Sequence, residues 1–345
     1  MSKKFLLIFS ILIMGSLFFA ACAPTAPAAE EDGILVCQIT DTGGIDDKSF
    51  NATAWKGITD AQAQLGIRGT YIESQEVADY EKNLNAFIEE GCDLIITVGF
   101  LIGDATAAAA EANPDNKFSI IDYAYDPAIP NVIGQVFNTD EAAFLAGYAA
   151  AAVTQTGKVG TFGGLPIPPV TIFMKGFVEG VNYYNAAKGT NVEVLGYNIA
   201  DGTGLFSMDF SDQQKGRELA VSLMDEGADV ILPVAGPVGL GAAAAIQERG
   251  NAYLIGVDSD WYLTAPEYGA FTLTSVMKKM DATTVAVIES VIDGTFTGGV
   301  VVGTLQNQGV DIAPFHDLSN LISAEVQAEI NQIREDIIAG RIVLQ

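Results

Sequence analysis

Acidic side chains stand directly after several apolar runs, at positions where a ligand site would form on a parallel sheet. Asp41, Asp122 and Asp258 each follow such a run, and Lys278 ends another. In an open α/β sheet, ligands bind beyond the carboxyl ends of the strands, where the N-termini of the following helices also point. Carboxylates accept hydrogen bonds from paired hydroxyl groups. The pattern therefore favours a ligand that carries hydroxyls.

Arginine is missing from all of these positions. The chain has five arginines, and none follows a predicted strand: Arg68 precedes one, Arg217 and Arg249 fall in predicted helices, and Arg334 and Arg341 lie late in the tail. A phosphate or an amino-acid carboxylate would favour a guanidinium partner, and the aspartates would repel it. Phe50, Phe173 and one of Phe206 or Phe210 can supply flat apolar faces for a ring. A nucleoside fits these residues, and a plain sugar is the alternative ligand.

Each of these residues also has an ordinary structural interpretation. A lone aspartate at a strand end can cap a helix, and Phe50 and Phe173 fall in amphipathic segments where they could be core residues. Lys278 beside Lys279 could belong to a solvated face. Gly236 follows an apolar run and begins a glycine-rich stretch, but the spacing is not that of a dinucleotide-binding loop. The functional interpretation therefore rests on the common location of the residues, and we expect no cofactor.

Metal chemistry has little support in the composition. His316 is the single histidine, which excludes sites built from several histidines and weakens any case for histidine-assisted catalysis. Cys37 lies midway along an apolar run, and Cys92 precedes another. If those runs form adjacent parallel strands, the two sulfurs lie at different heights, beyond the ~7 Å Cα separation that a disulfide allows. We predict two buried free thiols.

Apolar runs alternate with helical periods from residue 33 onward. The predicted strands are 34–39, 70–74, 94–98, 118–122 and 132–137, then 158–162, 192–198, 230–234, 254–257 and 271–276. The predicted helices are 48–65, 79–90, 141–155, 172–184, 213–226, 242–249 and 282–292. Most strand runs are continuously apolar, which is typical of parallel strands covered on both faces. Two successive sets of five strands predict an α/β protein with two doubly wound lobes.

The segment after residue 270 is long enough to pass between the lobes more than once. We expect about three crossover strands and a cleft that closes by hinge motion on a ligand. The predicted first lobe comprises residues 33–153 plus about 271–296. The predicted second lobe comprises 154–270 plus about 297–345.

The N-terminus has the pattern of an export signal. Lys3 and Lys4 precede an apolar run of about 15 residues, too short for a comfortable membrane span. The run ends in Phe19-Ala20-Ala21-Cys22, which resembles a bacterial lipobox, although leucine is more usual than Phe19. We predict a signal peptide over 1–21, lipidation of Cys22 and a flexible tether over 22–32. The alternative is a secreted protein cut near Ala21.

The chain is strongly acidic. It has 17 basic and 43 acidic residues, and removal of the two signal lysines leaves 15 basic residues and a net charge of −28. Such a surface repels nucleic acid and anionic lipid, so we expect no nucleic-acid partner and membrane attachment through the lipid anchor only.

Several stretches together resemble the basic membrane protein (BMP) family of lipoproteins, which includes purine nucleoside receptor A-like substrate-binding proteins of ABC transporters. The matching stretches are 41–51, 97–100, 144–148, 158–164, 175–177, 212–220, 255–260 and 273–278. The resemblance implies a type I periplasmic-binding-protein fold and capture of a nucleoside, with purine expected, outside the cell. It also implies partners, namely the permease and ATPase subunits of an ABC importer, and we expect a monomer on the extracytoplasmic face of the cell membrane.

The resemblance also assigns roles to the candidate residues. Phe50 and a phenylalanine of the 206–210 region would stack on the base, and Phe173 is a weaker match. The other implied roles are base-edge recognition by Asp122 and Asn51, ribose binding by Asp258 and Lys278, and pocket lining by Asp41 and Gly236. The chain departs from the family where two aromatic candidates, Phe206 and Phe210, replace one. We expect a binding protein rather than an enzyme. The alternatives are a ligand-sensing lipoprotein without a transport role and a nucleoside hydrolase.

Overall fold

The computed structural model describes residues 33–344. The predicted signal peptide, the lipidation site at Cys22 and the tether lie outside these residues. The residues from Ile34 onward form one compact unit, and the following description concerns that unit. No helix within residues 33–344 combines the length and the apolarity needed to cross a membrane.

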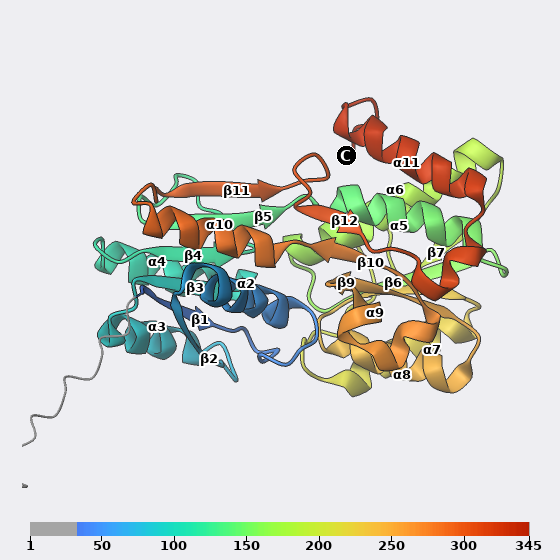
Figure 1. Cartoon of the computed structure of the whole chain (residues 1–345). Coiled ribbons are helices and arrows are strands. Elements are labelled where there is room, and N and C mark those ends of the chain that lie inside the picture. The colour runs from blue at the N-terminus through green and yellow to red at the C-terminus, as the bar shows by residue number, and fades with distance from the viewer. Residues whose placement is uncertain (1–32, 345) are drawn as a thin grey trace, which may run out of the picture. The chain divides into compact units, whose positions relative to one another are not determined.

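The first lobe is built on a six-stranded parallel sheet (Figure 1, left). Its strands, in spatial order, are β11 (Gly299–Gly303), β5 (Val132–Phe137), β4 (Phe118–Ile121), β3 (Leu94–Val98), β1 (Leu35–Ile39) and β2 (Arg68–Ile72). Helices α2 (Phe50–Leu65) and α10 (Met280–Ile292) pack together, as do α3 (Asp79–Glu90) and α4 (Gly103–Ala112). The side chains of α2 and of α3 belong to different core clusters, so the two helix pairs cover opposite faces of the sheet.

The second lobe repeats this plan (Figure 1, right). Its strands are β12 (Val310–Ile312), β10 (Thr272–Lys278), β9 (Tyr253–Asp258), β8 (Val230–Val234), β6 (Lys158–Gly163) and β7 (Glu193–Leu195), with β12 antiparallel to β10. Its helices are α5 (Thr139–Val153), α6 (Pro168–Lys188), α7 (Gln213–Asp225), α8 (Val238–Arg249), the short α9 (Trp261–Thr264) and α11 (Ala324–Ile338). Short 3-10 turns η1 (Phe100–Ile102), η2 (Pro266–Phe271) and η3 (His316–Leu321) complete the unit.

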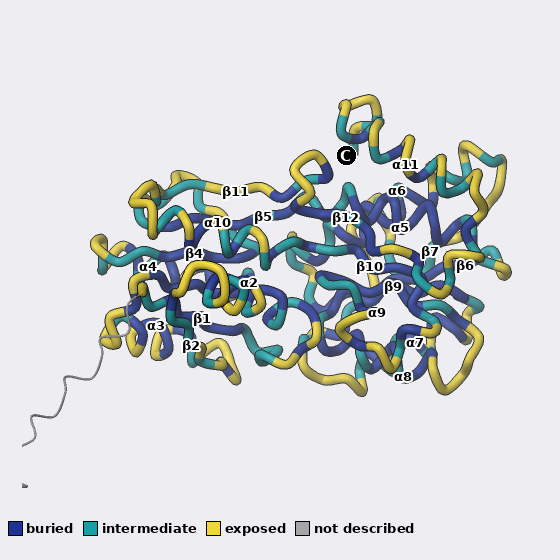
Figure 2. The backbone as a smooth tube through the Cα atoms, in the orientation of Figure 1, coloured by how far each residue is buried: buried dark blue, intermediate teal, exposed yellow. Residues whose placement is uncertain are grey.

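Burial on both faces explains why the strand sequences are continuously apolar and do not alternate apolar with polar residues. Every residue of β3 and β8 is buried, because helices cover both faces of each sheet. Figure 2 shows the inner strands of both sheets as mainly buried, whereas the edge strand β11 is mainly exposed. The prediction of an α/β protein with two doubly wound lobes is confirmed.

The lobe assignment of three segments was wrong. Helix α5, placed with the first lobe, packs against α6, α11 and β12 of the second. Strand β10 extends the second sheet as the parallel neighbour of β9, and β11 joins the first sheet beside β5. The chain therefore crosses between the sheets near residues 137–139, 278–280 and 303–310. These three crossings agree with the expected number, and each begins where a strand ends.

The prediction of two free thiols was also wrong. Cys37 and Cys92 form a disulfide, with their Cα atoms 6.1 Å apart. The strands do run parallel and adjacent, with Val36 opposite Leu94. However, Cys92 does not continue the line of β3. Gly91 ends α3 in a left-handed conformation, and the Cys92 amide donates to the Phe87 carbonyl, so the chain folds back toward the sheet.

Candidate functional site

A cavity lies between the two lobes. Eight of the ten predicted ligand-binding residues line it: Asp41, Phe50, Asp122, Phe173, Phe210, Gly236, Asp258 and Lys278. They come from the carboxyl ends of strands in both sheets and from the segments that follow. Asn51 and Phe206 are not among the lining residues.

Lys278 is the cation of the cavity. Its side chain is only 2% exposed, so it does not belong to a solvated face. The ammonium lies 2.6 Å from Asp122 Oδ2 and 3.7 Å from Asp258 Oδ1. It also lies 4.7 Å from the centre of the Phe50 ring and 5.5 Å from that of Phe173. Since Asp122 belongs to the first lobe and Lys278 to the second, this ion pair joins the two lobes across the cavity.

Asp122 and Asp258 have equivalent positions in the two sheets. Each stands at the end of a strand with a left-handed backbone, φ 66° at Asp122 and 68° at Asp258. This conformation costs a non-glycine residue about 1–2 kcal/mol, and such residues cluster at ligand sites. Burial raises the pKa of the Asp122 carboxyl, and the adjacent Lys278 opposes that rise.

Asp41 and Asp47 share the loop between β1 and α2. Asp41 Oδ1 accepts hydrogen bonds from the Gly43 amide and from Asn51 Nδ2, at 2.8 and 2.7 Å. Asn51 therefore lies behind Asp41 and fixes its orientation. Asp47 accepts from the amides of Ser49, Asn51 and Ala52 and thereby caps α2. Burial raises the pKa of both carboxyls, that of Asp47 to about 7.

The two aromatic candidates of the 206–210 region differ in location. Phe210 lines the cavity and lies over Gly164, where an added Cβ would be 2.2 Å from the ring. Phe206 packs instead on Gly163, with which its backbone forms a bridge. The sequence left this choice open, and the structure places Phe210 in the cavity beside Phe50 and Phe173.

Several lining residues were not predicted. They are Gly43, Asp47, Gly99, Phe100, Leu101, Ile167, Pro169, Val170, Val234, Ala235, Pro237 and Val257. Applying the strand-end rule to β3 would have found Phe100, since that strand ends at Val98. The prolines and Ile167 carry no chemical signal, because they contribute shape alone.

The charges of the cavity are unbalanced. Four carboxylates, those of Asp41, Asp47, Asp122 and Asp258, face a single ammonium, and no arginine of residues 33–344 lines the cavity. Such a wall accepts hydrogen bonds from a ligand and disfavours anions. The apolar and aromatic side chains provide contact area for a flat ring. No group of acidic, histidine or cysteine side chains in the described part of the chain could hold a metal ion.

Two lobes of this topology around one cavity form a type I periplasmic-binding-protein fold. A solute-binding protein of an ABC transporter from Aeropyrum pernix K1 has a similar structure. Its TM-score is 0.81 at 28% identity, covering 90% of this chain and 94% of that one.

The family model described as "ABC transporter substrate-binding protein PnrA-like" (Bmp) matches residues 34–345, and the chain belongs to this family. Among curated relatives, the ABC transporter nucleoside-binding protein BmpA of Lactococcus lactis subsp. cremoris (strain MG1363) is 30% identical, covering 100% of this chain and 99% of the relative. Basic membrane protein A of Borreliella burgdorferi is also 30% identical, covering 97% and 94%. The protein is therefore an ABC transporter substrate-binding protein.

Proposed function

We propose that this protein captures a neutral nucleoside, most readily a purine nucleoside, and delivers it to the permease and ATPase subunits of an ABC importer. The observation that carries the proposal is the buried Lys278, held between Asp122 and Asp258 among phenylalanine rings in a cavity without arginine. This combination suits hydroxyl groups at one end of a ligand and an uncharged ring at the other.

In this proposal the base lies between Phe50 and Phe210, with Phe173 closing the apolar wall. The ribose hydroxyls bind Asp258 and Lys278. Asp41 is suited to the base edge, because both protein hydrogen bonds to its carboxylate fall on Oδ1. Asn51 would then act on the base through Asp41 rather than directly.

The relatives support the choice of ligand. The name of the Lactococcus lactis relative states that it binds nucleosides, and that protein aligns with the whole of this chain. The family is one of substrate-binding proteins, which supports a binding role over an enzymatic one. The cavity is complete within one chain, so we propose that the monomer is the binding unit.

We further propose that the protein works on the extracytoplasmic face of the cell membrane, held by a lipid on Cys22. The disulfide between Cys37 and Cys92 suits an oxidising compartment. Mass spectrometry of the protein from membranes would test the anchor. The expected result is an acylated N-terminal cysteine at position 22, and an unmodified N-terminus would contradict it.

Isothermal titration calorimetry of protein freed from bound ligand would test the proposed function. The panel is inosine, guanosine, adenosine, cytidine, inosine monophosphate, glucose and galactose. We expect saturable binding of at least one purine nucleoside and much weaker binding of its monophosphate, because the cavity is acidic. Binding of a sugar without binding of any nucleoside would contradict the proposal. Release of free base during incubation with inosine would indicate a hydrolase instead.

A further inference from the structure

Two serine hydroxyls cross between the lobes beside the ligand cavity. Ser49, just before α2 in the first lobe, lies 2.9 Å from the Val257 carbonyl oxygen and 2.8 Å from Asp258 Oδ2 in the second lobe. In the opposite direction, Ser259 Oγ donates to the Lys48 carbonyl oxygen at 2.9 Å. The two serines therefore join the start of α2 to the end of β9 reciprocally.

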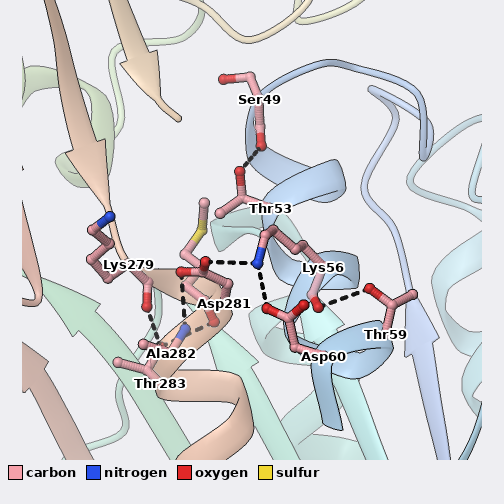
Figure 3. A network of polar contacts seen from close by, with 10 residues as sticks. Ser49, Thr53, Lys56, Thr59, Asp60, Lys279, Asp281, Ala282 and Thr283 are labelled. Carbon is pink, nitrogen blue, oxygen red and sulfur yellow. Dashed lines mark hydrogen bonds and ion pairs between the residues drawn. The ribbon is translucent and has the colours of Figure 1, made fainter. Parts of the chain in front are cut away.

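The Ser49 hydroxyl has no role in its own helix. It makes no cap hydrogen bond, because the Asp47 carboxylate already accepts from the first amides of α2. Only the main chain of Ser49 serves the helix, with its carbonyl accepting from the Thr53 hydroxyl at 2.5 Å. Figure 3 shows the hydroxyl turned away from α2. A fully buried hydroxyl that points out of its own element is explained here by its partners in the other lobe.

Asp258 depends on this contact. One of its carboxylate oxygens accepts from Ser49, and the other lies 3.7 Å from the Lys278 ammonium, beyond ordinary hydrogen-bond length. The Ser49 hydroxyl is thus the closest side-chain partner of the Asp258 carboxylate, which lines the cavity. Because this partner comes from the opposite lobe, Asp258 is held in this orientation only while the lobes touch.

Helix α2 is fixed within the first lobe by contacts of its middle turns. Lys56 of α2 pairs with Asp60 and with Asp281 of α10, the latter at 3.5 Å (Figure 3). The two helices also approach closely at Gly57, where an added Cβ would lie 2.6 Å from the Asp281 carbonyl oxygen. Opening of the cleft would therefore carry Ser49 away from Asp258 together with the helix pair.

We propose that Ser49 and Ser259 form an interlobe latch, in which Ser49 is a positioning residue that orients Asp258 and both serines slow the release of the ligand. The identity of the ligand rests on the proposed function, whereas the effect on closure does not. The chemistry is a pair of neutral hydroxyl donors, and no group in it needs to change its charge.

Dissociation of inosine, measured by stopped flow, tests the latch. We expect Ser49→Ala to accelerate dissociation about 10-fold or more, because it removes a hydrogen bond to a charged group, and Ser259→Ala to accelerate it about 3- to 10-fold. Association should change little, since the latch forms after the ligand has entered. Ser119→Ala is the matched control, because its hydroxyl donates to the Ile133 carbonyl oxygen at 2.9 Å within one lobe.

A double-mutant cycle separates positioning from a merely structural effect. If Ser49 acts through Asp258, Ser49→Ala should have a much smaller effect in an Asp258→Asn background than in the wild type. Equal effects in both backgrounds would overturn the positioning role. Dissociation rates of both latch variants equal to that of Ser119→Ala would overturn the latch.

Small-angle X-ray scattering gives a readout that does not need the ligand to be a nucleoside. We expect the Ser49→Ala/Ser259→Ala protein to have a larger radius of gyration than the wild type, either without ligand or in the presence of inosine. If inosine and the other nucleosides fail to bind, the proposed function fails. The comparison of the ligand-free variant with the ligand-free wild type would still test the latch. Identical radii under all conditions would overturn it.

Discussion

The two walls of the cavity differ in chemistry. The first lobe presents the carboxylates of Asp41, Asp47 and Asp122, whereas the second presents the ammonium of Lys278 and one carboxylate, Asp258. The second wall is also the more apolar, since Phe173, Phe210, two prolines and several aliphatic side chains come from it. In this account the base stacks between Phe50 of the first wall and Phe210 of the second, so neither wall alone completes the site. Ligand binding must therefore favour the closed arrangement of the lobes, because a single ligand can contact both walls only in that arrangement.

Removal of the cation should break this complementarity most severely. Lys278→Met leaves Asp122 and Asp258 buried without their shared partner, a change that costs about 3–5 kcal/mol for buried pairs. We expect nucleoside affinity to fall roughly 100- to 1000-fold in calorimetry. Lys279→Met, at the neighbouring position outside the cavity, is the matched control. Equal affinities of the two variants would contradict the account.

Loss of the carboxylate on the second wall should have the next largest effect. Asp258→Ala removes a charged acceptor for the ribose hydroxyls, which corresponds to about 1.5–3 kcal/mol and a loss of affinity of up to about 100-fold. Asp46→Ala removes a carboxylate that does not line the cavity and should leave affinity unchanged. An Asp258→Ala protein that binds as tightly as the wild type would exclude this residue from the site.

Two phenylalanine variants test which ring stacks on the base in the apolar part of the site. Phe210→Ala should lower affinity for a purine nucleoside about 10-fold, since stacking adds about 0.5–1.5 kcal/mol to the loss of apolar contact. Phe206→Ala should lower the free energy of unfolding while leaving affinity close to that of the wild type. The reverse pattern, measured by calorimetry and urea denaturation, would assign the stacking role to Phe206.

The acidic side of the cavity should give stability a dependence on pH. Burial raises the pKa of Asp47 from 3.8 to about 7, so the folded state binds a proton that the unfolded state releases. The stabilisation is present below the unfolded pKa and is lost as the pH rises from about 4 through 7. We expect the free energy of unfolding to fall by about 1–3 kcal/mol over this window.

Asp47→Asn should reduce that slope, because an amide keeps an acceptor for the helix amides but does not titrate. Asp46→Asn, at the exposed neighbouring position, should retain the slope of the wild type. Urea denaturation at several pH values measures both. An Asp47→Asn protein with an undiminished slope would assign the titration to other groups, such as Asp41 and Asp122, whose pKa values burial also raises.

The sequence predicted ten of the twelve strands of the described residues, the two-lobed class and eight residues of the cavity, because buried parallel strands are continuously apolar and their carboxyl ends meet at one edge. It could not predict where the chain changes lobes. Strand β10 resembles any buried strand, and only its pairing with β9 assigns it to the second sheet. The disulfide was missed for a related reason, since the turn at Gly91 moves Cys92 off the line of β3.

Within the site, the charged residues were easier to predict than the residues that give the cavity its shape. Asp122, Asp258 and Lys278 follow strands and carry chemistry, so the strand-end rule finds them. The choice of Phe210 over Phe206 depends on packing against two adjacent glycines, which no local pattern encodes. The contact between Ser49 and Asp258 joins positions 209 residues apart and depends on how the lobes meet.

A crystal structure of the protein grown with inosine would test the central claim most directly. The account predicts electron density for the nucleoside in the interlobe cavity, with the base between Phe50 and Phe210 and the ribose hydroxyls on Asp258 and Lys278. Density for the nucleoside elsewhere, or an empty cavity in crystals of protein that binds inosine in solution, would contradict it.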